Sequence, residues 1–476
     1  MKNNLPALLA MALVTWGADS TSQERPIPAS PYPLAAAGWG PEAADGLYYS
    51  RWVEDWTAMR AAGTAPPLKA LPLGRGMNLT FNTETRLRHE DGATVSGADL
   101  QQHLLRSVLG ADLRFNTGLR LYAELGSGYS GGNGQATTAN FDNKQSLQQL
   151  FVDGRTTIRS ALLGVMIGRQ EFADGPRQLV SLSDGPNLHR TWNGTRVYLH
   201  DENFRIGAFD LRATRMGRGG FDETIDHAER LQGVNASVVV ARGAQDRNIY
   251  LEPFWLHSEH PAIMSREDVA GADDRDTFGA RLWGQRGDFR FDATLAHQSG
   301  NHAGRGIDAW AVMLVQSLTL AETAWKPRLT TRFDAASGDR AGNGEHEGFN
   351  QLYSSSNYLG EGRFLALRNL LLVTPGVSVS PSASTHVSVE YGFAQRLTRD
   401  DAAYGGGMRS YAGTREVPGH RIGCLLRVSG SWTGDWIGNN KVTLTGGYEY
   451  LDAGEVLKAA QLRSAGYGYL SLTLRY

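Results

Sequence analysis

The chain has 476 residues and a formal net charge of −2; 41% of its residues are hydrophobic and 57 are glycine. That apolar share is too small for the two or three soluble cores that this length would suggest, and a mean hydropathy of −0.35 excludes a bundle of membrane-spanning helices. The near-neutral charge gives no reason to expect nucleic acid as a partner.

Residues 1–18 predict a secretory signal peptide. Lys2 precedes an apolar run from Leu5 to Val14, and the small residues Gly17 and Ala18 follow as a cleavage region. A signal peptide directs a chain out of the cytoplasm, so we expect the mature protein in the cell envelope.

Residues 19–70 predict an N-terminal linker with one short helix. The first half is rich in proline, alanine and glycine, which suits an extended arm. Residues 47–60 carry tryptophan and charged residues at the spacing of a short amphipathic helix. We expect this part to lie in the periplasm or to plug the periplasmic mouth of a channel, where it would also be placed to dock a periplasmic partner.

Residues 71–476 predict an all-β transmembrane antiparallel barrel. From Met77 onward, apolar and polar residues alternate in segment after segment, which is the pattern of strands with two different faces. Short turns such as 116–118 alternate with long polar loops such as 337–350, an asymmetry typical of outer-membrane barrels. The final strand keeps its alternation up to Tyr476, as expected of a strand that closes a barrel onto its first strand.

The length of this region predicts about 18 strands, with about 16 as the alternative, because each strand with its turn or loop takes roughly 22–25 residues. A barrel of this size leaves an aqueous channel wide enough for solutes. The chain is too short to hold both a barrel of about 22 strands and a globular plug, so a plugged active transporter is not expected.

One face of each predicted strand carries the charged residues. We expect this face to line the lumen, because a charge that faces lipid near the membrane midplane costs about 2–4 kcal/mol. For each such residue the competing role is an ion pair that holds the wall or an inserted loop. The predicted lumen residues are Arg86, Arg88, Arg106, Asp112, Arg114, Arg120, Glu124, Asp210, Arg212, Arg332, Asp334, Arg396 and Arg427.

Residues 147–199 contain a recognisable block of motifs. The strand LFVDG is followed by the motif Gly168–Glu171 and by a loop that contains Asn187 and Arg190, and a returning strand completes the block. This block resembles the alginate-export family of outer-membrane porins.

The resemblance extends over nearly all of residues 77–476. It implies an 18-stranded barrel whose charged, arginine-bearing lumen passes polyuronates or related solutes. It also implies that Arg169, Glu171 and Arg190 line the pore or bind the solute. Strand parity at Arg169 is ambiguous, and we expect this residue in the lumen.

Two places depart from the family pattern. An exporter of alginate carries an arginine and a glutamate where this chain has Gln148 and Gln149, and an arginine where it has Glu171. The resemblance therefore implies a porin of this type with a less positive pore, and alginate does not follow as its solute.

We therefore predict a porin of the bacterial outer membrane for passive diffusion of hydrophilic solutes, anionic or saccharide in character, and not an enzyme. The 12 histidines are scattered along the chain, and we expect no metal site and no cofactor. The alternatives are a barrel with a structural or adhesive role and an outer-membrane hydrolase. The expected partners are outer-membrane lipid, a small hydrophilic or oligosaccharide solute and a periplasmic protein, and the barrel is expected to be a monomer.

Overall fold

The computed structural model describes most of the chain, namely residues 29–39, 42–44, 46–133, 138–174, 178–244, 247–265, 269–342, 344–436 and 440–476. The signal peptide predicted over residues 1–18 lies outside the described residues. Among those that are described, no helix is both long enough and apolar enough to cross a membrane.

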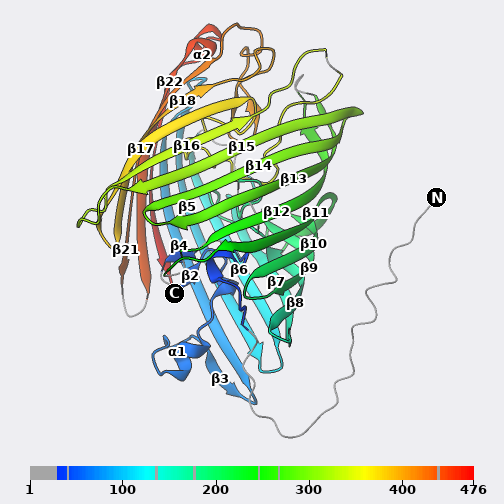
Figure 1. Cartoon of the computed structure of the whole chain (residues 1–476), viewed down its shortest axis with the longest axis vertical. Coiled ribbons are helices and arrows are strands. Elements are labelled where there is room, and N and C mark those ends of the chain that lie inside the picture. Colours follow the sequence, from blue (N-terminus) through cyan, green and yellow to red (C-terminus); the bar gives the residue numbers. More distant parts are fainter. Residues whose placement is uncertain are drawn as a thin grey trace, which may run out of the picture.

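Eighteen antiparallel strands of the described residues form a closed barrel (Figure 1). Each strand pairs with the next barrel strand along the chain, and the last pairs with the first, so the sheet has no open edge. This architecture confirms the predicted all-β barrel and its strand number. The barrel strands are β4 (Met77–Ala93), β5 (Asp99–Phe115), β6 (Leu119–Asn133), β7 (Asn143–Ile158), β8 (Ala161–Glu171), β9 (Thr191–His200), β10 (Phe204–Arg215), β11 (Thr224–Ala241), β12 (Ile249–Met264), β13 (Ala270–Arg286), β14 (Phe289–His302), β15 (Arg305–Thr319), β16 (Arg328–Ala336), β17 (Leu370–Ser382), β18 (Thr385–Gln395), β21 (Arg421–Asp435), β22 (Lys441–Ala453) and β23 (Ala465–Arg475).

Short elements lie before the barrel and in its loops. They are η1 (Leu34–Ala36), β1 (Glu42–Ala44), β2 (Leu47–Tyr48), η2 (Arg51–Val53), α1 (Thr57–Ala61), β3 (Leu71–Gly74), β19 (Tyr404–Gly405), β20 (Arg409–Ser410) and α2 (Glu455–Ala459).

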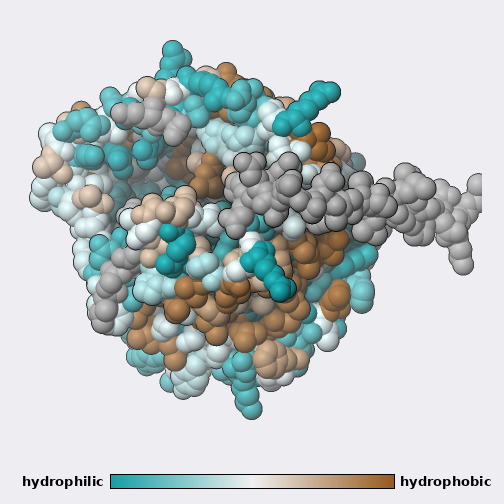
Figure 2. Space-filling view, turned by 90° about the horizontal axis from the view of Figure 1, so that it is seen from below, coloured by the Kyte–Doolittle hydropathy of each residue, from teal (hydrophilic) through white to brown (hydrophobic). Residues whose placement is uncertain are grey.

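The wall is apolar outside and charged inside over β4 to β6, as strand parity predicts. On β5 the side chains of Leu105 and Leu109 are exposed on the outer face, whereas Arg106 and Asp112 point inward and are buried. Lipid chains favour apolar side chains on the outer face, and polar groups inside the barrel can pair with one another. Figure 2 shows such apolar side chains gathered over the lower outer surface in the view from below.

The two ends of the barrel differ in their connections. One end has short turns, such as 116–118 and 287–288, and the other has the long loops 172–190, 337–369 and 396–420. Short turns lie in the periplasm in barrels of this kind, so we assign the first end to the periplasm. The short elements α1 and β3 lie at this end, at the bottom of Figure 1.

The seam of the barrel joins β23 to β4. β4 extends further into the periplasm than β23 does, and β3 pairs with the first residues of β4, placing Leu71 opposite Leu79. The backbone of Tyr476 makes two hydrogen bonds with Thr83, of 2.8 and 3.0 Å. The last strand is therefore paired through its end, and β3 continues the pairing with β4 beyond it.

The described part of residues 29–56, which we call the N-terminal segment, lies against the inner wall. Tyr32 shares a hydrogen bond of 2.8 Å with Ser237 of β11. The ring of Trp39 meets that of Tyr198 on β9 edge to face, with centroids 4.9 Å apart. Side chains of the segment and of the wall thus form a common packed interior, and β2 lies within the outline of the barrel in Figure 1.

The single helix predicted over residues 47–60 is replaced by the 3-10 turn η2 and by α1, which has five residues. Wall side chains bind backbone carbonyls in this stretch: Arg120 donates to Trp52, and Arg114 donates to Glu54 at 2.5 Å. A helix would need carbonyl oxygens of this stretch for its own hydrogen bonds. The barrel wall satisfies these groups instead, so a continuous helix is not required.

Candidate functional site: the charged lumen

The described parts of the extracellular loop 172–190, residues 172–174 and 178–190, fold into the lumen, where two wall arginines hold the loop. Arg86 of β4 donates to the backbone carbonyls of Asp184 and Pro186, each at 2.5 Å. Arg106 of β5 donates to the Asp184 carboxylate at 2.6 Å. These contacts hold the loop in front of β4 and β5, so the loop narrows the opening of the barrel.

Glu84 of β4 is the centre of a buried network of charges. Its carboxylate pairs with Arg106 of β5, with Arg51 of the N-terminal segment at 3.1 Å, and with Arg475 of β23 at 2.9 Å. None of these four side chains is more than 6% exposed. Burying a charge costs several kcal/mol unless opposite charges and hydrogen bonds surround it, so Glu84 and its partners tie three strands and the N-terminal segment together.

Arg51 also binds a second carboxylate. Its Nε and Nη2 donate to the two oxygens of Glu124 on β6, both at 2.9 Å. Tyr122 donates to the same carboxylate at 2.8 Å, and Gln149 of β7 donates at 3.2 Å. Two parallel hydrogen bonds from one guanidinium make a strong and directional ion pair. Arg51 therefore anchors the N-terminal segment to the inner wall.

His189 of loop 172–190 joins two carboxylates. Its Nδ1 lies 2.6 Å from Glu171, and its Nε2 lies 2.7 Å from Asp184. Burial lowers the pKa of His189, but the Glu171 carboxylate and the hydrogen bonds to both carboxylates raise it to about 8. The imidazole is therefore protonated at neutral pH and donates from both nitrogens.

The N-terminal segment and loop 172–190 approach each other inside the barrel. The narrow space between them, which we call the constriction, is lined by Arg51, Arg106, Val108, Glu124, Gln148, Glu171, Asn187, Leu188 and His189. The positive and negative groups around it are mostly paired with one another, and the space itself is too small to hold a water molecule. Figure 2 shows a hollow on the periplasmic side of the barrel.

The predicted lumen residues Asp112 and Arg114 lie in the lumen and hold the N-terminal segment. Asp112 pairs with Arg114 at 2.9 Å and with Arg120 at 2.7 Å. Arg114 also pairs with Asp55 of the N-terminal segment at 2.6 Å. These residues therefore form ion pairs that hold an inserted segment. This is the alternative to solute contact that was considered for each lumen residue.

Arg332 and Arg427 also face the lumen, where they hold loop 337–369. Arg332 of β16 donates to the carbonyl of Tyr358 at 3.0 Å. Arg427 of β21 donates to the carbonyl of Leu359 at 2.7 Å. Both arginines therefore support a loop that covers the wall at this place.

Among the motif residues that the family resemblance implies, Glu171 borders the constriction and Arg190 does not line it. The guanidinium of Arg190 donates to the carbonyl of Tyr353 and lies over its ring, 5.3 Å from the centroid. Within the described part of the chain, no hydrogen bond or ion pair joins Arg169, Glu171 and Arg190 to one another.

The predicted place of Arg169 in the lumen is wrong. Arg169 stands opposite Leu150 of β7, whose side chain is 45% exposed on the outer face, and directly opposed residues share a face of the sheet. Its guanidinium donates to Asn193 at 3.1 Å and lies 3.6 Å from Glu223. Arg169 therefore stabilises the extracellular rim from outside.

Arg212 also faces outward, which corrects its predicted place in the lumen. Its neighbours on β10, Leu211 and Ala213, are buried in the interior, and successive side chains of a strand point to opposite faces. Arg212 lies 4.0 Å from Glu259 of β12 on the outer face. Asp210 shares that face with Arg212 and is misplaced by the same argument.

Strand parity fails at β10 because long loops fill the extracellular half of the lumen. Phe172 of loop 172–190 and Phe349 of loop 337–369 belong to one buried cluster with inward side chains of β10 to β12. An apolar wall residue that faces this cluster is removed from water, which is favourable. The charged residues of the same strands then face outward, near the extracellular end.

Arg396, predicted to line the pore, instead holds loop 396–420 together. It follows the end of β18, is buried, and donates to the carbonyls of Thr414 and Val417, each at 2.5 Å. Its donors are directed at the backbone of its own loop, so its role in the structure is to shape that loop.

Sequence analysis missed Arg51, Asp184 and His189 as parts of the site. These residues lie outside the alternating strands, so strand parity gives no signal for them. The charge and tryptophan content of residues 47–60 was the one indication that this segment reaches the lumen.

Comparisons with known proteins agree with this architecture. The family model for alginate export matches residues 76–470. No curated protein matches the sequence.

Solved structures with the same fold include three porins of Pseudomonas. OccK2 (OpdF) of Pseudomonas aeruginosa, solved in complex with glucuronate, is 13% identical with a TM-score of 0.51, and the match covers 84% of this chain and 97% of that one. OpdK of Pseudomonas aeruginosa, solved with vanillate, is 14% identical with a TM-score of 0.53, covering 83% and 98%. A BenF-like porin from Pseudomonas fluorescens Pf-5 is 10% identical with a TM-score of 0.52, covering 84% and 99%. At such identities the likeness establishes the fold.

Proposed function

This chain belongs to the alginate export family, and from that membership we propose that it is a passive porin for hydrophilic solutes of anionic or saccharide character. It is an outer-membrane β-barrel of the porin type in a bacterial cell. In our proposal the solute moves down its gradient through a single barrel, the barrel works as a monomer, and no covalent chemistry takes place.

The observation that carries the proposal is that arginines in the lumen bind carboxylates through directed hydrogen bonds. Arg106 binds the carboxylate of Asp184, and Arg51 binds the carboxylate of Glu124 through two hydrogen bonds. A guanidinium fork matches the geometry of a carboxylate and of adjacent oxygen acceptors. A uronate presents a carboxylate beside hydroxyl oxygens, so an interior of this kind suits it.

The constriction supports a solute class wider than alginate. Gln148 is neutral and Glu171 is negative at places where an alginate exporter carries arginine, and protonated His189 offsets the charge of Glu171. The result is a mixed field with arginines on more than one side. We therefore propose weak anion preference and recognition of sugar acids.

Single-channel recording of the refolded protein in a planar bilayer tests this function. We expect a reversal potential that favours chloride over potassium, and current block by oligouronates at lower concentrations than by neutral oligosaccharides. Cation preference without uronate block would contradict the solute class. If neither the full protein nor a variant without residues 19–65 carried current, a structural or adhesive barrel would be the better account.

We also propose that the N-terminal segment plugs the periplasmic half of the channel. Arg51 anchors it to Glu84 and Glu124, and Arg114 anchors it through Asp55. Ion pairs and hydrogen bonds hold the segment. In this proposal a solute or a periplasmic partner competes for the groups that make them.

A further inference from the structure

Two histidines are stacked where loop 337–369 meets the extracellular ends of β14 and β15. His302 is the last residue of β14, His346 stands in the loop, and both side chains are completely buried. The centroids of the two rings lie 4.5 Å apart, and their planes are inclined by 29°. The backbone of His346 also donates a hydrogen bond to Gly306 of β15 at 2.7 Å and accepts one from Asp308 at 3.2 Å. The histidine pair, as we call His302 and His346, thus lies at a place where the loop is attached to the barrel wall.

Each ring of the histidine pair presents its Nδ1 to one carboxylate. Nδ1 of His302 lies 3.0 Å from Asp273 of β13, and Nδ1 of His346 lies 3.1 Å from Asp339 of the loop. An ionised carboxylate only accepts hydrogen bonds, so Nδ1 is the nitrogen that carries the hydrogen in a neutral ring. The carboxylates therefore fix the tautomer of both rings and leave Nε2 as an acceptor.

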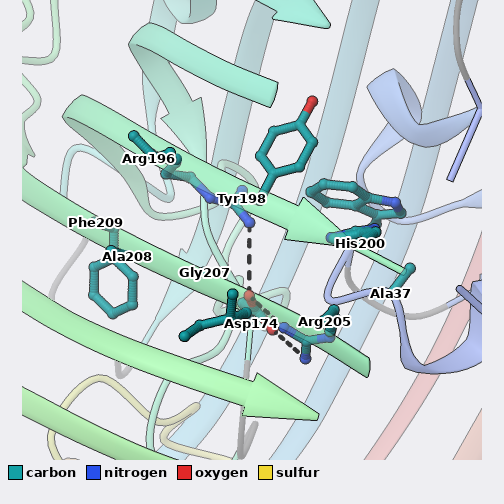
Figure 3. A pocket seen from close by; sticks show the side chains of 12 residues that line it. Ala37, Asp174, Arg196, Tyr198, His200, Arg205, Gly207, Ala208 and Phe209 are labelled. Atoms are coloured by element: carbon teal, nitrogen blue, oxygen red, sulfur yellow. Dashed lines mark hydrogen bonds and ion pairs between the residues drawn. The ribbon is translucent and has the colours of Figure 1, made fainter. Parts of the chain in front are cut away.

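The Nε2 atoms of the histidine pair have no partner. Both are buried, and no hydrogen bond reaches them from the described part of the chain. Asp174, another buried ionic group of the lumen, has opposite charge on two sides, because it lies between Arg196 and Arg205 (Figure 3). A proton on Nε2 of the histidine pair would instead create an N–H donor with no acceptor and a positive charge against a second ring. The closed arrangement therefore suits neutral imidazoles.

The charged groups around the histidine pair oppose the protonation of His346. Burial lowers the pKa of His346, and the contact with Asp339 raises it only in part. Arg368 of the loop and Arg275 of β13 lower it further, so the net shift is downward from the ordinary value of about 6.5. The other charged groups at or next to the pair are Asp273 of β13, Arg305 of β15, Asp401 of loop 396–420, and Glu345 and Glu347 beside His346.

We propose that the histidine pair is an acid-sensitive clasp, which holds loop 337–369 against β14 and β15 while both rings are neutral and releases it when a proton binds Nε2 of His346. In the closed state this nitrogen has no acceptor for its proton, and in the open state water supplies one. Opening therefore takes up a proton, so acid favours the open state. The neutral ring contributes fully to closure above about pH 6.5, and this contribution is lost as the pH falls from there toward the lowered pKa of His346.

Release of the clasp loosens the packing of the extracellular half of the lumen. Phe349 and Tyr353 of the same loop belong to the buried cluster that fills this half. The backbone of Tyr353 also exchanges hydrogen bonds with Leu179 and Ser181 of loop 172–190, at 2.8 and 3.1 Å. That loop is held in the opposite sense by His189, which makes its contacts in the protonated form. The two loops together are therefore held most firmly near neutral pH.

Hydrogen exchange of the backbone amides of residues 344–350 in the folded protein tests the clasp, after correction for the intrinsic rates at each pH. Uptake of one proton on opening changes the opening equilibrium by up to about tenfold per pH unit. We expect the protection of these amides to fall at least about tenfold between about pH 7.5 and about pH 5. His346→Phe keeps an aromatic ring for the stack and cannot be protonated, so its protection should change by less than about twofold over the same range.

His297→Phe is the matched control. It makes the same change on the same strand but on the outer face, where His297 is 55% exposed beside Asp308, and it should lose protection in acid as the unchanged protein does. Burial raises the pKa of Asp339, but its contacts with His346 and the amide of Glu347 lower it by more, so this carboxylate does not titrate in the same range. An equal fall in H346F and in the unchanged protein, or no fall in either, would overturn the proposal.

A second measurement needs no variant. Exchange of the Cε1 hydrogens of histidines with deuterium, followed by mass spectrometry, reports the titration of each ring in the unchanged protein. The midpoint for His346 should lie below about 6.5. A midpoint at or above this value would contradict the clasp, whether or not H346F folds.

Single-channel current separates the clasp from the porin function, on which only its effect on transport rests. We expect the unchanged protein to carry more current at about pH 5 than at about pH 7.5, and H346F to carry the same current at both. A conducting channel in which H346F and the unchanged protein exchange alike would leave the porin function standing without the clasp. A protein that carries no current, but loses protection in acid only when His346 is present, would keep the clasp without the porin function.

Discussion

Glu84 lies among three guanidinium groups, and its single charge compensates much of the positive charge buried at the seam of the barrel. Arg51 and Arg106 reach it from opposite neighbours, one from the N-terminal segment and one from β5. The carboxylate in this position allows the neighbouring guanidinium groups to remain buried away from water, and this role matters more than contact with a solute. The network therefore depends on one residue more than on any other.

We expect Glu84→Gln to lower the free energy of unfolding by about 3–5 kcal/mol, because removing one partner leaves buried charges uncompensated. Urea unfolding of the protein in lipid vesicles, followed by tryptophan fluorescence, measures this change. Asp91→Asn, on the exposed face of the same strand, is the control and should change the free energy by less than about 0.5 kcal/mol. Equal losses in the two variants would mean that the charge of Glu84 does not hold the network.

His189 gives loop 172–190 a dependence on pH. Its pKa of about 8 in the folded protein lies above the ordinary value of about 6.5. A group whose pKa is raised by folding stabilises the folded state fully below the ordinary value, and that contribution is lost as the pH rises through the folded value. The contacts of His189 with Glu171 and Asp184 should therefore be complete below about pH 6.5 and weaken through about pH 8, while Arg106 stays bound to Asp184.

Hydrogen exchange of the backbone amides of residues 178–190 measures this effect, after correction for the intrinsic rates at each pH. Protection should fall between about pH 6 and about pH 9 in the unchanged protein. His189→Gln should show little dependence on pH over the same range. If both proteins lost protection in parallel, the titrating group would be another residue.

The placement of single residues could be predicted where one rule applied throughout a strand. Arg106 and Asp112 were placed correctly because β5 alternates between apolar and polar residues and faces a polar interior. Arg212 was misplaced because its strand faces an apolar loop cluster, which reverses the meaning of the alternation. The sequence of β10 alone does not contain the information on which loops fill the lumen beside it.

At the scale of elements, the N-terminal segment is shaped by the wall and not by its own sequence pattern. Its carbonyl groups accept hydrogen bonds from Arg114 and Arg120 on β5 and β6. Local periodicity predicts a helix over residues 47–60, and it cannot register donors that lie 60 or more positions along the chain. The strands were predictable for the opposite reason, since their two-residue period is a local property that the barrel uses unchanged.

We expect Arg51→Gln to raise the single-channel conductance or the fraction of time that the channel is open. The substitution removes the double hydrogen bond to Glu124 and the ion pair with Glu84, which anchor the N-terminal segment. Arg75→Gln, in the exposed turn between β3 and β4, serves as the control and should leave the current unchanged. Identical currents in R51Q and R75Q would contradict the role of the segment as a plug.

At the scale of the whole molecule, the outer surface marks where the membrane ends. Trp255, Phe278 and Trp310 fall in one row across neighbouring strands, with His297 between the last two. Two residues further toward the extracellular end, the next row on the same outer face includes Asp276 and other polar residues. Aromatic rings favour the membrane interface and charges favour water or headgroups, so the extracellular boundary of the hydrocarbon lies between these two rows.

We expect Leu295→Arg to destabilise the folded barrel by about 2–4 kcal/mol, because its outward side chain lies below the aromatic row and faces hydrocarbon. Ser299→Arg, on the same strand and face but between Asp276 and Asp308, should cost less than about 1 kcal/mol. Unfolding titrations in vesicles of one lipid composition give both values. A larger loss for S299R than for L295R would place the membrane boundary elsewhere.

The barrel as a whole could be predicted because each barrel strand has two different faces, and apolar and polar residues therefore alternate along it. The filling of its interior could not, since it depends on which distant segments meet. Asp184 lies 78 positions from Arg106, and Arg51 lies 73 positions from Glu124. No spacing rule connects such pairs. Strand parity could therefore predict single arginines of the wall but not their partners.

The seam also joins parts of the chain that lie far apart in the sequence. Leu68 and Tyr476, which share a hydrogen bond beside it, are 408 positions apart, so closing the ring carries a cost in loop-closure entropy. The N-terminal segment is synthesised first, yet it ends enclosed by strands that are made later. The closed ring therefore encloses the segment. To leave the barrel, the segment must pass through the periplasmic mouth or through an opened seam. We therefore expect its release from the finished barrel to depend on the rate of that passage as well as on the strength of the contacts that hold it.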